Sequence, residues 1–167
     1  YNTIQRKVTV NLLQLNSNAF AFPIAIDIFE EGKRIRHNVF VKGKDASFTF
    51  TYSKLPTLIQ VNADGVLLCE IIENKVLSDY IFQLKNAQNY SHRREALLAI
   101  SNKQNEKKVF NAVSNAMNDP SYKIRILALE KIDLINKFSK KNTIQKIKEI
   151  ASTDEKTLVQ AVALETL

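Results

Sequence analysis

Several residue types are scarce in this chain, and each absence excludes a kind of site or a class of protein. The 167 residues include no Trp, one Cys and two His. A single cysteine excludes an intrachain disulfide. The histidines, His37 and His92, stand 55 residues apart, far from the short spacing of a zinc motif. The longest apolar runs, such as residues 66–69, are far shorter than the roughly 20 residues that span a bilayer.

The motifs of common catalytic sites are also missing. The sequence contains no H-E-x-x-H, no glycine-rich phosphate loop and no G-x-S-x-G elbow. The paired acids Glu30 and Glu31 fall at an expected hairpin tip, where water would keep them solvated and unsuited to acid–base chemistry. The sequence therefore assigns no catalytic residue and no metal ligand, and it leaves any substrate-binding residues unassigned.

What is present is the composition of a globular protein with two different halves. Hydrophobic residues make up 45% of the chain and charged residues 25%, enough to bury a core. All three glycines lie in the first 65 residues, and the last 102 residues have none. The net charge of +7 arises mostly in the second half, since residues 1–77 carry 9 basic and 7 acidic groups and residues 78–167 carry 15 and 10.

The first half alternates apolar and polar side chains with the period of half-buried strands. The predicted strands are residues 7–15, 20–29, 35–41, 48–52, 58–61 and 66–72. Residues 30–33 predict a tight hairpin turn. Pro23 favours an edge or bulge position because proline cannot donate to a ladder. Cys69 falls in the last strand, where we expect it to face a core rather than to act as a reactive thiol.

The second half repeats one helical pattern three times. Residues 90–100, 122–132 and 157–167 align, with Ala96, Ala128 and Ala163 coinciding at offsets of 32 and 35 residues. Other apolar-periodic stretches lie between them, so each repeat is predicted to be a pair of helices. One pair cannot bury its apolar stripe alone, and neighbouring pairs are therefore expected to stack into a solenoid.

The repeat type is predicted to be HEAT-like. Its period is closer to the roughly 34 residues of tetratricopeptide repeats, but the Trp and Gly of that repeat are absent. Asp119 and Asp154 are expected to cap helices, with Pro120 as a first helical residue. Arg93 and Arg125 share a repeat position. An ion pair with Asp between repeats is the favoured interpretation there, and a ligand-facing cation is the alternative.

A cluster of lysines raises the question of nucleic-acid binding. Its members are Lys137, Lys140, Lys141, Lys146 and Lys148. Only Phe138 is interleaved with them, and base stacking would need more exposed aromatic rings. Nucleic acid is therefore not an expected partner.

The order of short motifs carries a family resemblance. The motifs are Leu13-Gln14-Leu15, Phe22-Pro23-Ile24, Val61-Asn62-Ala63-Asp64-Gly65, Tyr80-Ile81-Phe82-Gln83-Leu84 and Arg94-Glu95-Ala96-Leu97. Over nearly the whole chain this series resembles the C-terminal region of bacterial zinc aminopeptidases of the aminopeptidase N family, which are gluzincin metallopeptidases. In that family the zinc site and a Gly-x-Met-Glu-Asn motif lie in a separate catalytic domain. Neither motif occurs here, so no residue role is carried over.

The resemblance implies an all-β part followed by an all-α part. The expected domains are a small antiparallel immunoglobulin-like β-sandwich over residues 1–77 and HEAT-like helical repeats over residues 78–167. Because the chain starts at Tyr1 and stops inside an apolar helical pattern at Leu167, we expect it to be a piece of a longer protein. Any targeting signal would then lie outside it, and a soluble protein of the cytoplasm or periplasm is expected.

The implied function is accessory. The piece would help to position domains and restrict substrate access in an enzyme that cleaves N-terminal residues from peptides. Its partners would be the catalytic domain of the same parent, which would hold the zinc, and the peptide substrate. The alternative is a HEAT-like protein–protein adaptor with no link to an enzyme.

Overall fold

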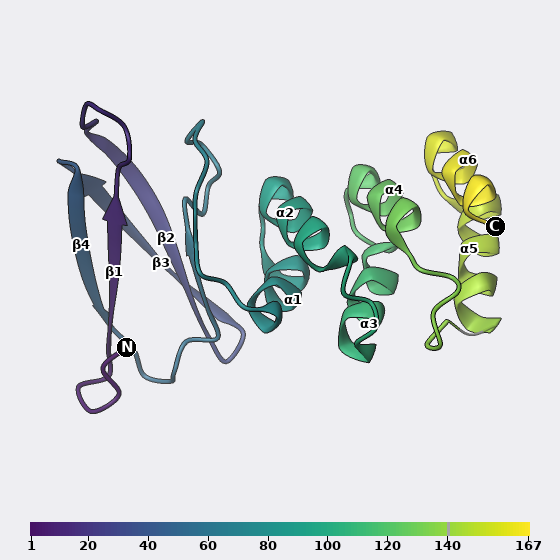
Figure 1. Cartoon of the computed structure of the whole chain (residues 1–167), viewed down its shortest axis with the longest axis horizontal. Helices are drawn as coiled ribbons and strands as arrows, with labels where there is room; N and C mark the ends of the chain where they lie inside the picture. The colour runs from purple at the N-terminus through teal and green to yellow at the C-terminus, as the bar shows by residue number, and fades with distance from the viewer. Residues whose placement is uncertain (140) are drawn as a thin grey trace. The chain divides into compact units, whose positions relative to one another are not determined.

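The chain forms strands first and helices afterwards, in a computed structural model that describes residues 1–139 and 141–167 (Figure 1). The strands of the described residues are β1 (Lys7–Leu13), β2 (Phe22–Glu30), β3 (Lys33–Val41), β4 (Asp45–Thr51) and β5 (Leu58–Val61). The helices are α1 (Leu77–Asn86), α2 (Tyr90–Ser101), α3 (Lys107–Ala116), α4 (Tyr122–Lys131), α5 (Lys141–Thr153) and α6 (Thr157–Thr166). The predicted order of a β part before an α part is confirmed.

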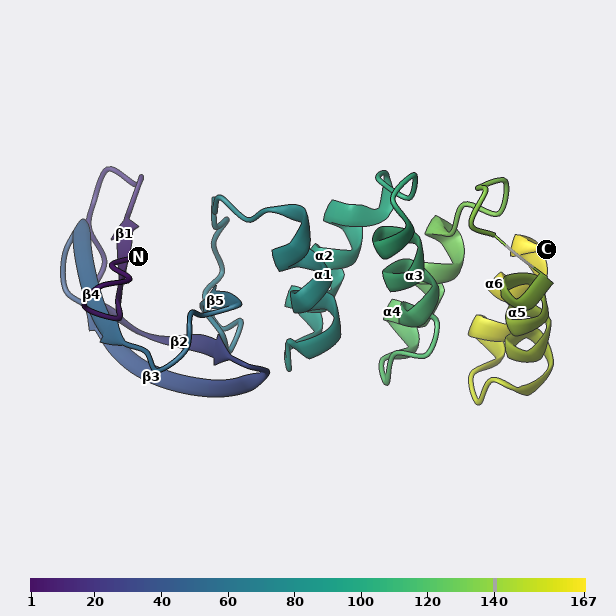
Figure 2. The ribbon, with the colours of Figure 1, turned by 90° about the horizontal axis from the view of Figure 1, so that it is seen from below.

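The strands form two antiparallel sheets (Figure 2). One pairs β1 with β4, and the other has the order β3-β2-β5. Val8 of β1 shares a buried cluster with Ile26 and Ile28 of β2, so apolar side chains from both sheets meet. Alternate residues of a strand point to one face, which is why the period-2 pattern of the sequence identified these core positions.

The β2–β3 hairpin has the predicted turn. Glu31 and Gly32 adopt φ values of 47° and 80°, and a two-residue loop with both φ values positive matches the twist of its strands. Pro23 lies opposite Phe40 of β3, whereas β5 pairs only with Ile26 to Phe29 of β2. At Pro23 the strand therefore has a single neighbour in the sheet, as its missing N–H requires.

Two expectations for this half are wrong. Glu30 is buried, and its Oε2 accepts the backbone N–H groups of Ser53 and Lys54, each at 2.9 Å. Those bonds compensate the carboxylate for leaving water. Residues 66–72 form no strand, and Cys69 is exposed instead of facing a core. A strand needs a ladder partner, and within the described part of the chain this apolar run has none.

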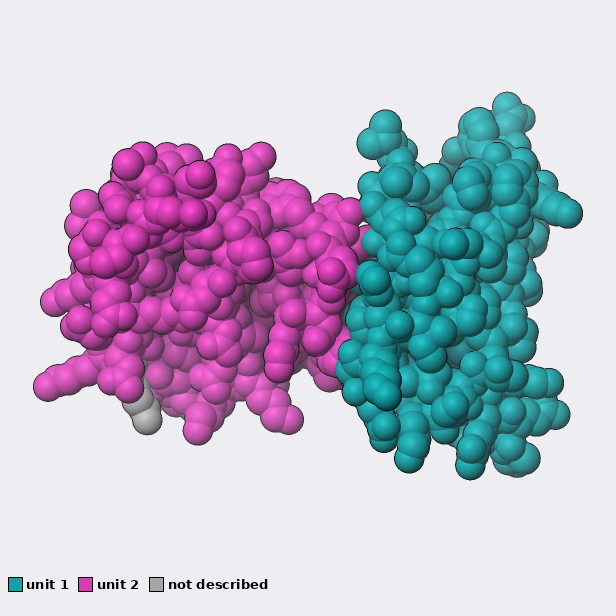
Figure 3. Space-filling model, turned by 180° about the vertical axis from the view of Figure 1, so that it is seen from behind, with its two compact units in different colours: residues 1–72 teal, residues 73–167 magenta. Residues whose placement is uncertain are grey.

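Contacts group the chain into two compact units, Tyr1–Ile72 and Glu73–Leu167 (Figure 3). The division into domains after residue 77 stays a prediction. Within the second unit the helices pair as α1 with α2, α3 with α4 and α5 with α6. The second helices follow one another in contact, α2 on α4 and α4 on α6, around one continuous core. They coincide with the three aligned stretches of the sequence, and the HEAT-like repeat type and the immunoglobulin-like sandwich stay predictions.

The three coinciding alanines are fully buried in this core. The leucine that follows each alanine differs in exposure from repeat to repeat. Leu97 and Leu129 are 0% and 1% exposed, whereas Leu164 of α6 is 64% exposed. In the first two repeats this leucine belongs to the buried core.

The buried alanines lead to a stability prediction. Ala128→Leu adds three heavy atoms where neighbouring helices pack closely and should destabilise the helical unit by about 1–3 kcal/mol. Ala161→Leu, on the exposed side of α6, is the matched control and should change stability by less than about 0.5 kcal/mol. Denaturant unfolding followed by far-ultraviolet circular dichroism measures both. Equal effects would contradict the close packing at Ala128.

Candidate functional site

The two histidines of the chain lie in different units. Among the described residues no group of three or more His, Cys, Asp and Glu side chains could hold a metal ion. His37 lies in β3 with its ring 4.3 Å from that of Phe50, centroid to centroid. His92 is buried in the first turn of α2, in the other unit.

Within the described part of the chain, every helix is too short or too polar to span a membrane.

The second unit is instead organised by an ion pair between repeats. Arg93 of α2 donates through Nε and Nη2 to the two carboxylate oxygens of Asp119, at 2.8 and 3.1 Å. Its Nη1 donates to the carbonyl groups of Ala87 and Gln88, just before its own helix. One guanidinium thus closes the loop of its own repeat and binds the loop of the next.

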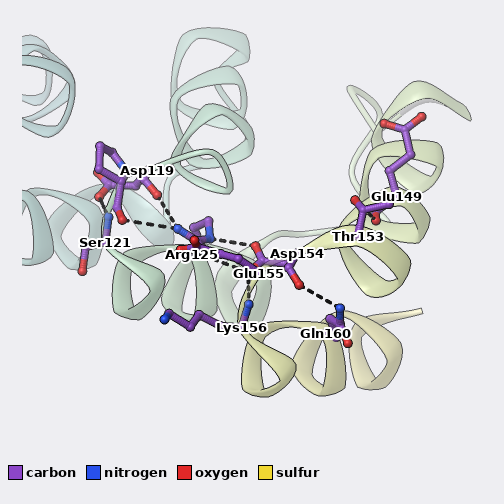
Figure 4. A network of polar contacts seen from close by, with 10 residues as sticks. Asp119, Ser121, Arg125, Glu149, Thr153, Asp154, Glu155, Lys156 and Gln160 are labelled. Carbon is purple, nitrogen blue, oxygen red and sulfur yellow. Dashed lines mark hydrogen bonds and ion pairs between the residues drawn. The ribbon is translucent and has the colours of Figure 1, made fainter.

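The same arrangement recurs one repeat later (Figure 4). Arg125 of α4 donates to both carboxylate oxygens of Asp154, at 2.8 and 2.9 Å, and through Nη1 to the carbonyl of Asp119. The hydrogen bond to Asp154 raises the pKa of Arg125 although burial opposes it. Burial acts to raise the pKa of Asp154, but the hydrogen bonds from Arg125 and the Lys156 N–H outweigh it and lower that pKa. The predicted ion pair between repeats is confirmed.

The aspartates are not the helix caps that the sequence suggested. Helices α4 and α6 begin at Tyr122 and Thr157, and their N-cap residues are Ser121 and Lys156. Asp119 accepts the N–H of Ser121 at 2.7 Å, and Asp154 accepts that of Lys156 at 2.9 Å. Both carboxylates therefore order the loop before the helix, because the arginine of the preceding repeat holds them there.

The third repeat keeps the bond to its own loop but has no arginine. Gln160 of α6 stands where the earlier repeats have arginine, and it donates to the carbonyl of Asp154 at 2.7 Å. That bond to its own loop matches the one Arg125 makes to Asp119. A neutral amide offers no cation for a further carboxylate.

A second polar link joins the opposite ends of the helices. Gln104 is buried in the loop before α3 and donates to the carbonyls of Ser101 and Lys131 at 2.8 and 2.6 Å. Its own side-chain oxygen accepts the N–H of Asp133. The first two helix pairs are therefore tied together at both ends by polar groups that have partners.

A charged cluster fixes the start of the helical unit. Lys75 Nζ lies 2.7 Å from Glu73 Oε2 and 3.9 Å from Glu95 Oε1. Burial raises the pKa of Glu73, with Lys75 opposing the change. Gln83 donates to Glu95 Oε2 at 2.8 Å. Since both carboxylates have partners within the cluster, its role is to hold the segment before α1 against α2.

The helical unit has an open groove of about 500 Å³ between α1 and α3. Its lining comprises Ile81, Leu84, Lys85, Lys108, Asn111, Ala112, Asn115, Ala116, Asn118, Asp119 and Pro120. The volume lies in the range of roughly 300–1,000 Å³ that is typical of ligand sites. Sequence reasoning missed this site, although its polar residues recur at helical spacing along α3.

Two members of the lysine cluster have contacts within the fold. Lys146 is partly buried and donates to the Ser114 carbonyl at 2.7 Å, and burial lowers its pKa. Lys137 lies over the ring of Phe138, which itself packs on Phe110. Lys140 lies outside the described residues. Lys146 and Phe138 thus have structural roles, and the expectation that nucleic acid is not a partner stays a prediction.

The fold is similar to part of a solved enzyme, the crystal structure of Legionella pneumophila aminopeptidase A in complex with aspartic acid. The TM-score is 0.63 at 15% sequence identity, and the match covers 98% of this chain and 22% of that chain. At this identity the likeness concerns the fold alone. No protein family and no curated protein matches the sequence.

The buried ion pair should make stability depend on pH. Asp154→Asn leaves the Arg125 charge without its bidentate partner. Near neutral pH it should lower the free energy of unfolding by about 3 kcal/mol or more. Because the folded-state pKa of Asp154 is lowered, its contribution is complete above the unfolded pKa and is lost as pH falls through the folded value. The difference from the unmodified chain should therefore shrink in acid. Glu155→Gln, at an exposed partner of Arg125, is the control and should change little.

The exposure of Cys69 is directly measurable. Ellman's reagent should modify it in the native protein about as fast as in urea, because no burial protects it. A much slower native reaction would mean that Cys69 is covered, as the sequence pattern suggested.

Proposed function

We propose that this chain is a non-catalytic accessory part of a larger parent protein. The parent would be a zinc-dependent aminopeptidase, which removes N-terminal residues from peptides. The observation that carries the proposal is the fold likeness to an aminopeptidase, which extends over 98% of this chain and only 22% of the enzyme. The ordered motifs from Leu13 to Leu97 point to the same class of enzyme.

In this proposal the first unit is an immunoglobulin-like sandwich that adjoins the catalytic domain. The second unit is a set of HEAT-like repeats that limits access of long substrates. The zinc ion belongs to the catalytic domain of the parent, and the partners of this chain are that domain and the peptide substrate. The chain would contribute by its shape, because ion pairs such as the buried Arg125–Asp154 pair give the repeats a fixed spacing.

A second candidate is a HEAT-like adaptor for protein partners, with no link to an enzyme. The observation in its favour is the open groove on stacked helix pairs, a surface that repeat proteins use for binding. The two candidates differ in what they require outside this chain. Only the first requires a catalytic domain in the same protein.

The source gene and two assays test the proposal. We expect the reading frame upstream of Tyr1 to encode H-E-x-x-H followed by a downstream glutamate. The isolated chain should hold no stoichiometric zinc and should not hydrolyse aminoacyl-anilide substrates. Removing residues 73–167 from the parent should raise hydrolysis of long peptides relative to short ones, if access is restricted by the repeats. An upstream frame without the motif would favour the adaptor, and zinc or turnover in the isolated chain would contradict both.

A further inference from the structure

The groove between α1 and α3 carries a row of asparagines that the fold itself does not use. Lys108, Asn111, Asn115 and Asn118 succeed one another at spacings of 3, 4 and 3 residues, which places them along one side of α3 and its end. The first two asparagines are exposed within the helix, where this residue type is unfavourable. None of the three amides has a hydrogen-bond partner within the described residues.

Free amides in such a row offer a defined chemistry. Each asparagine presents one acceptor and two donors. An extended peptide backbone presents the complementary groups, with N–H and C=O in regular alternation. A row of outward-facing amides can therefore bind main chain without reading a particular side chain.

The charge of the groove is positive and uncompensated. Lys85 of α1 and Lys108 of α3 are exposed, and neither has an ion-pair partner within the described part of the chain. Asp119 is the one acid in the lining, and Arg93 and the Ser121 N–H already occupy its carboxylate. The lining therefore favours an anionic occupant.

The apolar part of the lining favours a peptide over a nucleic acid. It includes aliphatic side chains from both helices, among them Ile81, Leu84 and Ala112. The described lining contains no aromatic residue, so bases would find no ring on which to stack. Aliphatic contacts suit the side chains of a peptide.

We propose that the α1–α3 groove binds an acidic peptide segment in an extended conformation. Asn111, Asn115 and Asn118 would hold its backbone, and Lys85 and Lys108 would pair with its carboxylates. This goes beyond the accessory role proposed above and does not depend on it, because the groove lies wholly within the helical unit.

Fluorescence anisotropy of the full chain with a short fluorescein-labelled peptide of alternating alanine and glutamate tests the proposal. Binding should be measurable and should weaken about tenfold or more when Lys85→Glu and Lys108→Glu are combined, since charge-assisted hydrogen bonds are replaced by repulsion. The matched control combines Lys123→Glu and Lys148→Glu, exposed lysines outside the lining, and should stay within about twofold.

The asparagines are tested by a pair of opposite effects. Asn111→Ala combined with Asn115→Ala should weaken peptide binding and also raise the thermal midpoint of the helical unit, because alanine is the better helix former. A variant that merely failed to fold could not produce the second effect. In nuclear magnetic resonance spectra of the unmodified chain, the peptide should shift the side-chain amide signals of Asn111 and Asn115.

Several outcomes would overturn the proposal. They are no binding of the glutamate peptide, equal binding of the same peptide with glutamine in place of glutamate, and equal loss in the control variant. Binding of a single-stranded oligonucleotide in the groove while the peptide fails would also overturn it and would assign the site to nucleic acid.

Discussion

A buried guanidinium that spans two consecutive repeats sets the geometry of the helical unit. Arg93 and Arg125 each close the loop of their own repeat and bind a carboxylate in the next. A charge removed from water must be paired, so only one placement of the following loop satisfies it. Apolar packing supplies most of the stabilisation, but it is non-directional and would tolerate small shifts between helix pairs. The ion pair therefore fixes the spacing between helix pairs, whereas apolar packing provides most of the stability.

The groove shares residues with the loop that this ion pair holds. Asp119 and Pro120 line it, and Arg93 fixes the loop to which they belong. Asp119 and Pro120 therefore belong both to the loop that the ion pair holds and to the lining of the groove. Asn111 and Asn115 differ from them because the fold would be more stable without them. Side chains that lower stability without a structural role are where a binding function is best sought.

Periodicity in the sequence was enough to find most elements. Alternation located the strands, and the aligned stretches located α2, α4 and α6 close to their observed bounds. It was not enough where an element depends on a partner distant in sequence. Residues 66–72 are as apolar as a strand but have no ladder partner, and Cys69 is exposed as a result. Glu30 looked solvated because its two backbone partners, at Ser53 and Lys54, are far along the chain.

The class of each half, the repeated helix pattern and the pairing of Arg with Asp were predictable from the amino-acid order, because they depend on local periodicity and on residues that recur in register. Contacts between distant segments were needed to show which Asp each Arg binds, that these carboxylates do not cap helices, and that Asn111, Asn115 and Lys85 border one groove. The difference comes from separation along the chain. Local pattern reports which face of an element is buried, whereas a binding surface is assembled from faces that meet only when separate helices pack.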